Sequence, residues 1–317
     1  MTVQTQNTSG KPVAFVGLGA MGLPMALNLL KGGVDLLCVA RRKEALAELA
    51  QHRAATTVDI ANVGRADVVV LCLPDGDAVR SLLLDGPRLG TGFRAGQIVV
   101  DTSTIEYRTV VEISEFLAAH GVTYLDAPIS GMAARARNGT LTIMCGGVAE
   151  AFDAVQPLLR LVGSDILYMG ASGNGQLAKL INQLLFDINA SALAELLPLA
   201  VKLGLEPELV ARVINGGTGR SYASEFFLPN ILAGKFHEGY PMRSAYKDLI
   251  SGADISATQG LPTPVLGAAT ATYQQALLRG HGDKDKGGMI CVFEELFGVV
   301  FRARQLQQTS AAAAHTP

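Results

Sequence analysis

The stretch "VAFVGLGAMGLPMALNLLKGG", residues 13–33, decides the fold of the first half of this chain. An apolar run leads into Gly17-x-Gly19-x-x-Gly22, and an amphipathic helical pattern follows at once. In such a strand–turn–helix unit the first glycine permits the tight turn, the second lets the backbone approach a pyrophosphate, and the third lets the helix pack on the strand. Glycines also end strands for steric reasons alone, but this context predicts a nucleotide-binding turn, with the phosphates on the N–H groups at the helix start.

The alternation of short apolar runs and helical patterns continues to about residue 168. The predicted strands are "VAFVGLG", "DLLCVAR", "ADVVVLCLP", "QIVVDTS", "TYLDAPIS" and "TIMCGG", and the predicted helices are Met21–Lys31, Lys43–Gln51, Asp77–Leu84 and Tyr107–His120. Strands that alternate with helices predict a mostly parallel sheet covered on both faces.

After Gly170 the pattern is helical throughout. The predicted helices are Leu177–Lys202, Pro207–Asn215, Glu225–Ala233, Met242–Gln259, Pro264–Arg279 and Met289–Arg304. The fold class is therefore α/β: an N-terminal Rossmann-type doubly wound domain (residues 11–172) is joined by a long interdomain helix to an all-α C-terminal domain (residues 173–305). Residues 1–10 and 306–317 are expected to be flexible termini.

The composition narrows the class of protein. The chain has 317 residues, of which 49% are hydrophobic, and a formal net charge of −2, so neither nucleic acid nor an anionic membrane is an expected partner. Four widely spaced cysteines form no CxxC pair and five histidines form no HExxH pattern, so we expect core thiols and no metal. No apolar run reaches 18 residues and the polar N-terminus is unlike a signal peptide, which predicts a cytoplasmic protein.

The end of the second predicted strand indicates which nucleotide binds. An Asp or Glu there would bind the ribose 2′-hydroxyl of NAD, but "CVARRKE" places Arg41 and Arg42 at this position. Two guanidinium groups suit a 2′-phosphate, which favours NADP, with NAD as the alternative. The two arginines would equally fit solvated charges at a strand end. Pro74 and Thr102–Thr104 follow later strands, where they would line the nicotinamide end or serve ordinary turn and helix-cap chemistry.

The helix over residues 177–202 carries the strongest catalytic candidate. Its first turns show an apolar stripe formed by Leu177, Leu180, Ile181, Leu184, Leu185 and Ile188, with Lys179, Asn182 and Gln183 on the opposite side. That opposite side continues with apolar residues, so the helix is expected to be enclosed by protein rather than wet. A lysine at such a place can exchange the hydroxyl proton that accompanies hydride transfer, and Asn182 can hold the same oxygen.

"DAPISGMAARARNGTL", residues 126–141, supplies another candidate surface. Ser130 and Gly131 end a strand, and a loop rich in small residues is expected to follow, whose N–H groups and hydroxyl would hold a carboxylate. A simple glycine-bearing connection to the next strand explains the same sequence. Lys247 and Asp248 are expected to form a charge pair on the outer face of a helix.

Taken together these motifs resemble the β-hydroxyacid dehydrogenase family, from about Lys11 to Arg304. Four blocks match in order: "GLGAMGLPMALNLL", "DAPISG…NGTLTIMCGG", "GNGQLAKLINQ" and "KDL". The resemblance implies Lys179 as general acid and base, with Asn182 positioning the substrate. It further implies substrate contacts from Ser130, Gly131, Met132, Thr104 and Lys247, and cofactor contacts from Gly17, Leu18, Gly19, Ala20, Met21, Gly22, Arg41, Arg42, Leu73, Pro74, Thr104, Lys247 and Asp248. Members associate as homodimers or homotetramers through the helical domain.

One departure concerns the substrate. Family members commonly carry a second glycine after Ser-Gly, where this chain has Met132, so the substrate need not be 3-hydroxyisobutyrate. Residues 216–227, including Ser221, Tyr222 and Phe226, are expected to overhang the substrate. The leading hypothesis is an NADP-preferring oxidoreductase for a small carboxylate-bearing β-hydroxy acid and its semialdehyde or keto acid. The alternatives are an imine reductase of the same architecture and a non-catalytic nucleotide-binding module.

Overall fold

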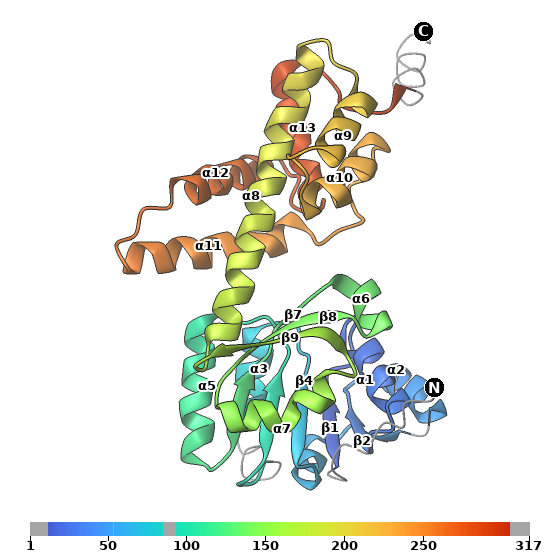
Figure 1. Cartoon of the computed structure of the whole chain (residues 1–317), viewed down its shortest axis with the longest axis vertical. Helices are drawn as coiled ribbons and strands as arrows, with labels where there is room; N and C mark the ends of the chain where they lie inside the picture. The colour runs from blue at the N-terminus through green and yellow to red at the C-terminus, as the bar shows by residue number, and fades with distance from the viewer. Residues whose placement is uncertain (1–11, 53, 85–92, 305–317) are drawn as a thin grey trace. The chain divides into compact units, whose positions relative to one another are not determined.

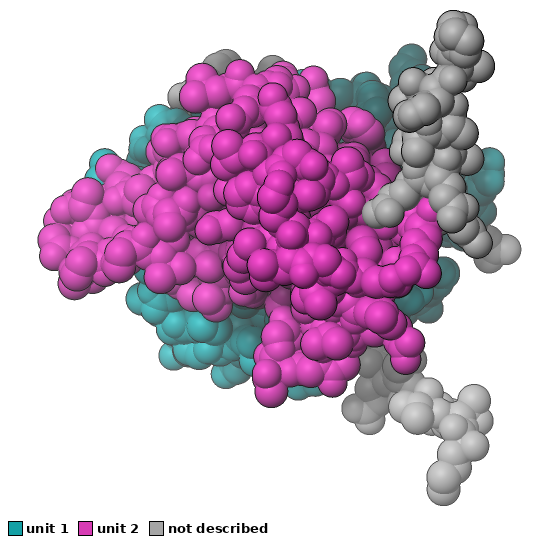
Figure 2. All heavy atoms as spheres, turned by 90° about the horizontal axis from the view of Figure 1, so that it is seen from above, with its two compact units in different colours: residues 1–179 teal, residues 180–317 magenta. Residues whose placement is uncertain are grey.

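The computed structural model describes residues 12–52, 54–84 and 93–304. The chain divides into two compact units, Met1–Lys179 and Leu180–Pro317 (Figure 2). The division lies within a helix, after the boundary at residues 172 and 173 that the sequence suggested. The expected flexible termini, residues 1–10 and 306–317, lie outside the described residues.

The first unit is built on a sheet with the order β3-β2-β1-β4-β5-β6-β8-β7, in which β9 also pairs with β8 (Figure 1). Its strands are β1 (Val13–Val16), β2 (Leu36–Val39), β3 (Ala55–Thr57), β4 (Val68–Leu71), β5 (Ile98–Asp101), β6 (Thr123–Asp126), β7 (Ile129–Ser130), β8 (Leu141–Gly146) and β9 (Gly163–Gly170). The pairs from β3 to β6 are parallel, and β8 is antiparallel to β6 and β7. The predicted mostly parallel, Rossmann-type sheet is confirmed.

Helices cover both faces of this sheet. Residues of β1 alternate between two cores: Val13 and Phe15 belong to one, Ala14 and Val16 to the other. The first core also contains side chains of α1 (Gly22–Lys31), α2 (Lys43–Gln51), α6 (Met132–Asn138) and α7 (Ala149–Leu159). The second contains side chains of η1 (Ile60–Arg65), α3 (Gly76–Leu83) and α5 (Tyr107–Ala119). Because both faces are buried, the central strands are continuous apolar runs, which made them recognisable in the sequence.

The carboxyl ends of five neighbouring strands are in register. Val39, Val16, Leu71, Asp101 and Asp126 form one row of paired residues across β2, β1, β4, β5 and β6. Residues that follow these positions by one to three places emerge at the same edge of the sheet. This is the edge at which open α/β sheets bind ligands.

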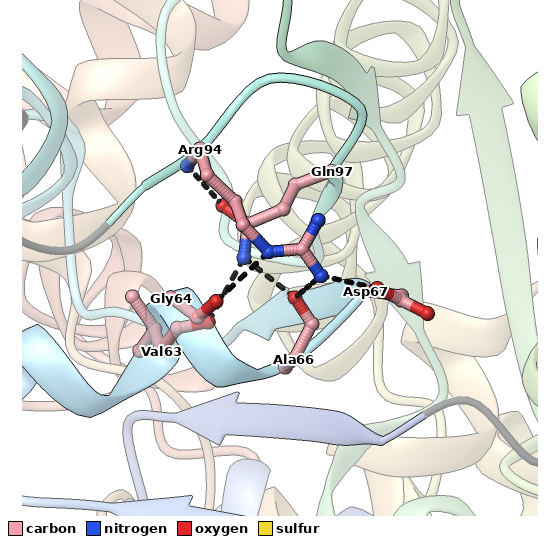
Figure 3. Close-up of polar contacts among 6 residues, drawn as sticks. All are labelled: Val63, Gly64, Ala66, Asp67, Arg94 and Gln97. Carbon is pink, nitrogen blue, oxygen red and sulfur yellow. Dashed lines mark hydrogen bonds and ion pairs between the residues drawn. The ribbon is translucent and has the colours of Figure 1, made fainter.

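The opposite, amino edge of the sheet is closed by a polar network (Figure 3). The buried amide of Gln97 donates to the carbonyls of Val63 (2.9 Å) and Ala66 (2.6 Å), and its oxygen accepts from Arg94 N (2.6 Å). The Arg94 side chain pairs with Asp67, directly before β4. These contacts tie η1 to the segment before β5, away from the edge that carries the predicted site.

The second unit is helical, as predicted. It contains the greater part of α8 (Asn174–Lys202), followed by α9 (Pro207–Gly216), α10 (Tyr222–Leu232), α11 (Met242–Thr258), α12 (Pro264–Leu278), η2 (Lys286–Met289) and α13 (Ile290–Phe297) (Figure 1). Its core gathers apolar side chains of all these helices, among them Leu197, Phe227 and Leu249. By length and composition α8 could cross a membrane, but core helices of soluble proteins meet the same criterion, so this is weak support for a span.

Two predicted segments differ from the structure. The small-residue segment after Gly131 is the helix α6, not a loop, because its alanines favour helix and Gly139 ends it in a left-handed conformation (φ 66°). The predicted last helix, Met289–Arg304, is shorter: α13 ends at Phe297 because Gly298 adopts the same conformation (φ 66°).

The buried face of α8 also differs from the predicted apolar stripe. Ile181 and Leu185 are 59% and 57% exposed, although both belong to that stripe. The α8 residues buried in the second unit are instead Leu184, Asp187, Ala190, Ser191, Ala194, Leu197 and Pro198. α8 is apolar around most of its circumference, so periodicity could not select the face. Small side chains, and the buried ion pair between Asp187 and Lys286, determine which face of α8 is buried.

Candidate active site

The glycine turn lies between β1 and α1, at the carboxyl edge of the sheet. Gly17 (φ 98°) runs so close to β4 that an added Cβ would lie 2.3 Å from Cys72 O, and a Cβ on Gly22 would lie 1.9 Å from Gly17 O. A Cβ on Gly19, in contrast, would meet nothing within 4 Å. Two glycines therefore serve packing, whereas the third leaves space in front of the backbone.

The start of α1 is suited to an anion. Met21, at the N-cap, makes no side-chain cap hydrogen bond, and the first turn holds no acidic residue. Leu18 is buried behind the turn, whereas Gly19 and Ala20 are exposed. N–H groups at an uncapped helix start bind phosphate well. The turn thus fits the pyrophosphate of a dinucleotide.

The predicted ribose and nicotinamide contacts lie along the same edge. Arg41 and Arg42 lie two and three residues after the end of β2 and are exposed, and Gly17 N donates to Val39 O (3.2 Å) at the end of that strand. Leu73 and Pro74 follow β4, half-buried and exposed respectively. The structure therefore brings these four residues and the glycine turn to one edge of the sheet.

The segment after β5, which carries Thr104, is held by a buried network. Ser103 Oγ accepts from Leu73 N (2.8 Å), and Ser103 N donates to Asp101 Oδ1 (2.9 Å). Tyr124 Oη donates to Asp101 Oδ2 (2.7 Å). Burial raises the pKa of the Asp101 carboxyl, and hydrogen bonds from Ser103 and Tyr124 oppose this shift. Thr104 itself is half-buried.

Ser130 ends β7, and Gly131 lies between β7 and α6. Gly131 (φ 137°) is the N-cap of α6, and Met132, its first residue, has a φ of 57°, unusual for a residue other than glycine. The Met132 side chain is 42% exposed. The turn therefore places Ser130 and Gly131 at the start of a short helix, next to the partly exposed side chain of Met132.

Lys179 lies in the second turn of α8 and is only 8% exposed. The start of this helix is fixed to the sheet by Asp126, whose carboxylate accepts from Gly173 N (2.7 Å) and Gln176 N (2.9 Å). Burial raises the pKa of Asp126 to about 6, although these two hydrogen bonds oppose the shift. A Cβ on Gly175 would lie 2.3 Å from Met144 O, so helix and sheet meet backbone to backbone here.

The second unit holds the other predicted residues. Asn182 is exposed on α8, and α11 carries Lys247, half-buried, and Asp248, 8% exposed. Gln183 Nε2 donates to Asp248 Oδ2 (3.4 Å), which links α11 to α8 four residues after Lys179. Asp248 is thus buried against α8 rather than on the outer face that its sequence context suggested.

Two residues near the predicted site, Asp126 and Gln176, were not singled out from the sequence, and Gln183 was named only as part of the polar side of the helix. Asp126 and Gln176 lie inside the blocks "DAPISG" and "GNGQLAKLINQ" but received no role. A carboxylate at the end of a strand and a glutamine within the first turn of an apolar helix were the available signals. Among the described residues no group of three His, Cys, Asp or Glu side chains is placed to hold a metal.

Comparison with known proteins gives the family. The family described as the NAD binding domain of 6-phosphogluconate dehydrogenase matches residues 12–170, and the one described as NAD-binding of NADP-dependent 3-hydroxyisobutyrate dehydrogenase matches residues 173–293. A 2-(hydroxymethyl)glutarate dehydrogenase from Eubacterium barkeri is 34% identical over 90% of this chain and 96% of its own. The chain belongs to the β-hydroxyacid dehydrogenase family. It is an NAD(P)-dependent hydroxyacid dehydrogenase.

Solved structures agree with this assignment. A 3-hydroxyisobutyrate dehydrogenase from Salmonella typhimurium has a TM-score of 0.80 and 29% identity, covering 89% of this chain and 100% of that one. A protein solved in complex with NADP+ has a TM-score of 0.76 and 27% identity, covering 88% and 99% of the two chains. The dehydrogenase thus shares its fold with these proteins over nearly their full length.

Proposed function

We propose that this dehydrogenase interconverts a small β-hydroxy acid and its semialdehyde or keto acid with NADP(H), and that Lys179 is its general acid and base. The observation that carries the proposal is the burial of Lys179, 8% exposed, in a helix whose start is fixed at the ligand-binding edge of the sheet. Lysine is rarely buried without a specific reason, and a reacting alcohol needs such a proton carrier.

The cofactor would be held by the glycine turn and its neighbours. The N–H groups of Gly19, Ala20 and Met21 would bind the pyrophosphate in the open space before Gly19. When bound, the nicotinamide supplies the hydride in reduction and accepts it in oxidation. Leu73, Pro74 and Thr104 would line the nicotinamide end of the cofactor at the sheet edge, with further contacts from Lys247 and Asp248.

A preference for NADP is supported by the two guanidinium groups of Arg41 and Arg42, which follow β2 where an acidic residue would favour NAD. The family match that names an NADP-dependent dehydrogenase, and the relative solved with NADP+, agree with this preference. NAD remains the alternative cofactor.

The chain's own residues would perform the proton chemistry. In reduction Lys179 Nζ gives a proton to the substrate oxygen, and in oxidation it takes the proton of the hydroxyl. Asn182, on the next turn of α8, would orient the same oxygen through its amide. Gln183 would assist by holding Asp248, and through it the position of Lys247 on α11.

The carboxylate of the substrate would be held by the Ser130 hydroxyl and the Gly131 N–H, with Thr104 nearby. Hydrogen bonds from neutral donors to a carboxylate are charge-assisted and therefore strong. Met132 follows directly and would restrict the space beside the carboxylate. Relatives named for 3-hydroxyisobutyrate and 2-(hydroxymethyl)glutarate support a small hydroxy acid as substrate.

We also propose that the helical unit mediates assembly into a homodimer or homotetramer. Exposed apolar side chains gather around the end of α8 and on α9: Leu203 is 71% exposed, Leu209 53% and Val213 73%. Burial against a second copy would remove this surface from water. The protein would otherwise be cytoplasmic and soluble, with a small molecule as its partner and neither nucleic acid nor a membrane. Val213→Glu should reduce the molar mass measured by light scattering.

A spectrophotometric panel tests the proposed activity. Small hydroxy acids are offered with NADP+, and semialdehydes, keto acids and cyclic imines with NADPH, each repeated with the NAD pair. Turnover of a β-hydroxy acid, and of its semialdehyde or keto acid in reverse, is the expected result. Turnover of cyclic imines alone would instead assign an imine reductase.

A further inference from the structure

The side chain of Gln176 connects the helix of Lys179 to the segment of Thr104. Gln176 Nε2 donates to Ser103 O (2.7 Å), and Gln176 Oε1 accepts from Ile105 N (3.2 Å). The side chain is 3% exposed, so neither bond is shared with bulk water. One amide group thus binds the backbone on both sides of Thr104, using its donor and its acceptor.

Both ends of this connection are themselves fixed. On one side, Asp126 accepts from Gln176 N, and the close approach of Gly175 to Met144 O seats the helix on the sheet. On the other side, Ser103 is bound to Leu73 N and to the Asp101 carboxyl. An unbroken series of hydrogen bonds therefore connects the first turn of α8 to the end of β4.

Lys179 lies three residues after Gln176, which is slightly less than one helical turn, or about 4.5 Å along the axis. An error in the position of the first turn is therefore transmitted directly to the lysine. We propose that Gln176 is a positioning residue, which fixes the position of Lys179 relative to Thr104 and Leu73. This inference rests on the proposed function, since it assumes that Lys179 moves the proton.

Removing the connection should lower the rate and spare the cofactor. Gln176→Met preserves the length of the side chain but neither hydrogen bond. Displacement of a catalytic group by about 1 Å can cost up to about a hundredfold, so we expect kcat to fall by about tenfold to a hundredfold. The dissociation constant of NADPH should stay within about twofold of wild type, because the glycine turn is untouched. Gln156→Met, on α7, is the matched control and should behave as wild type.

A second variant gives a readout that a merely structural role would not move. In Gln176→Glu the protonated carboxyl can still donate to Ser103 O and accept from Ile105 N, whereas the ionised form can only accept. Ionisable groups on the elements that contact it are Asp126, which accepts from Gln176 N, Asp101, which accepts from Ser103 N, and Lys179 on α8. The kcat of this variant should therefore approach wild type at low pH and fall, as pH rises, along a limb that wild type lacks.

The outcomes separate cleanly. A folded Gln176→Met enzyme with wild-type kcat would overturn the positioning role, as would a Gln176→Glu enzyme whose pH profile matches wild type. If Gln176→Met does not fold, the pH profile of Gln176→Glu decides. A wild-type protein that turns over no compound of the panel would refute the proposed function, and this inference with it. Loss of NADPH binding in both variants, in proportion to the rate, would assign Gln176 to folding alone.

Discussion

Lys286 forms an ion pair with Asp187 in the interior of the helical unit, where the two side chains are 2% and 0% exposed. Tyr273 Oη donates to the same carboxylate (2.9 Å), and the Lys286 ammonium lies 4.4 Å from the centre of the Phe186 ring. Burial raises the pKa of Asp187, and Lys286 opposes this shift. The pair joins η2 to the middle of α8 and so defines which face of that helix is buried.

Breaking this pair should be costly. Lys286→Met leaves a carboxylate buried with only the tyrosine hydroxyl, and we expect the free energy of unfolding to fall by about 3–5 kcal/mol. Urea denaturation followed by circular dichroism measures it. The double variant Lys286→Met, Asp187→Leu should recover most of the loss, because no charge then remains buried. Lys235→Met, at an exposed position, is the control and should lower the free energy of unfolding only slightly. An equally small decrease in Lys286→Met would contradict the account.

The pair also explains why one feature of the fold could not be predicted from the sequence. The strands of the first unit were recognisable because burial on both faces requires apolar runs such as Val68–Leu71. The face of α8 was not, because Ile181 and Leu185 look as apolar as the buried residues although they are exposed. Lys286, the ion-pair partner of Asp187 on the buried face, is 99 residues away from it in the chain. A local pattern contains no information about such a contact.

The pKa of Asp126 predicts a pH dependence of stability. Burial raises this pKa from 3.8 to about 6, so between these values the folded protein binds more protons than the unfolded chain. The contribution of Asp126 to the free energy of unfolding therefore falls as pH rises from 3.8 to about 6, by at most about 1.4 kcal/mol per pH unit, and is constant above.

Urea denaturation of wild type and Asp126→Asn across this range tests the sign. The stability of wild type relative to the variant should decrease as pH rises, because asparagine does not titrate. Asp153→Asn, exposed on α7, should leave the slope unchanged. A wild-type advantage that grows with pH would show that the two backbone hydrogen bonds outweigh burial.

The backbone at Met132 should be strained. Its φ of 57° lies in the left-handed region, which costs a residue with a Cβ about 1 kcal/mol. Met132→Gly should therefore exceed Met132→Ala in free energy of unfolding by about 0.5–1 kcal/mol. Both variants remove the long side chain, so the comparison isolates the backbone. Equal stability of the two, measured by urea denaturation, would contradict the strain.

The arginines after β2 should control cofactor choice. Arg41→Ala removes a guanidinium group from the expected 2′-phosphate position, so NADPH affinity should fall about tenfold, or about 1.4 kcal/mol, with little change for NADH. Fluorescence titration of both cofactors measures this, and Arg160→Ala, at an exposed position in the same unit, is the control. An unchanged ratio of the two affinities would remove the argument for NADP.

Part of the site could be predicted from the sequence, and the rest could not, for a related reason. Gly17, Gly19 and Gly22 signal their role through local chain geometry, and Lys179 is conspicuous in an apolar helix. Asp126 and Gln176 contact groups 47 to 73 residues away, so their function depends on the folded sheet edge. The sequence thus identified the groups expected to react but not those that hold them in place.

The most direct test of the account is turnover by Lys179→Met. Methionine suits a buried position of this size but cannot carry a proton. We expect the variant to fold and bind NADPH as wild type does, while kcat falls at least about a hundredfold at every pH. Lys31→Met, at the exposed end of α1, should retain full activity. A folded Lys179→Met enzyme within about threefold of the wild-type rate would contradict the assignment of Lys179 as the proton carrier.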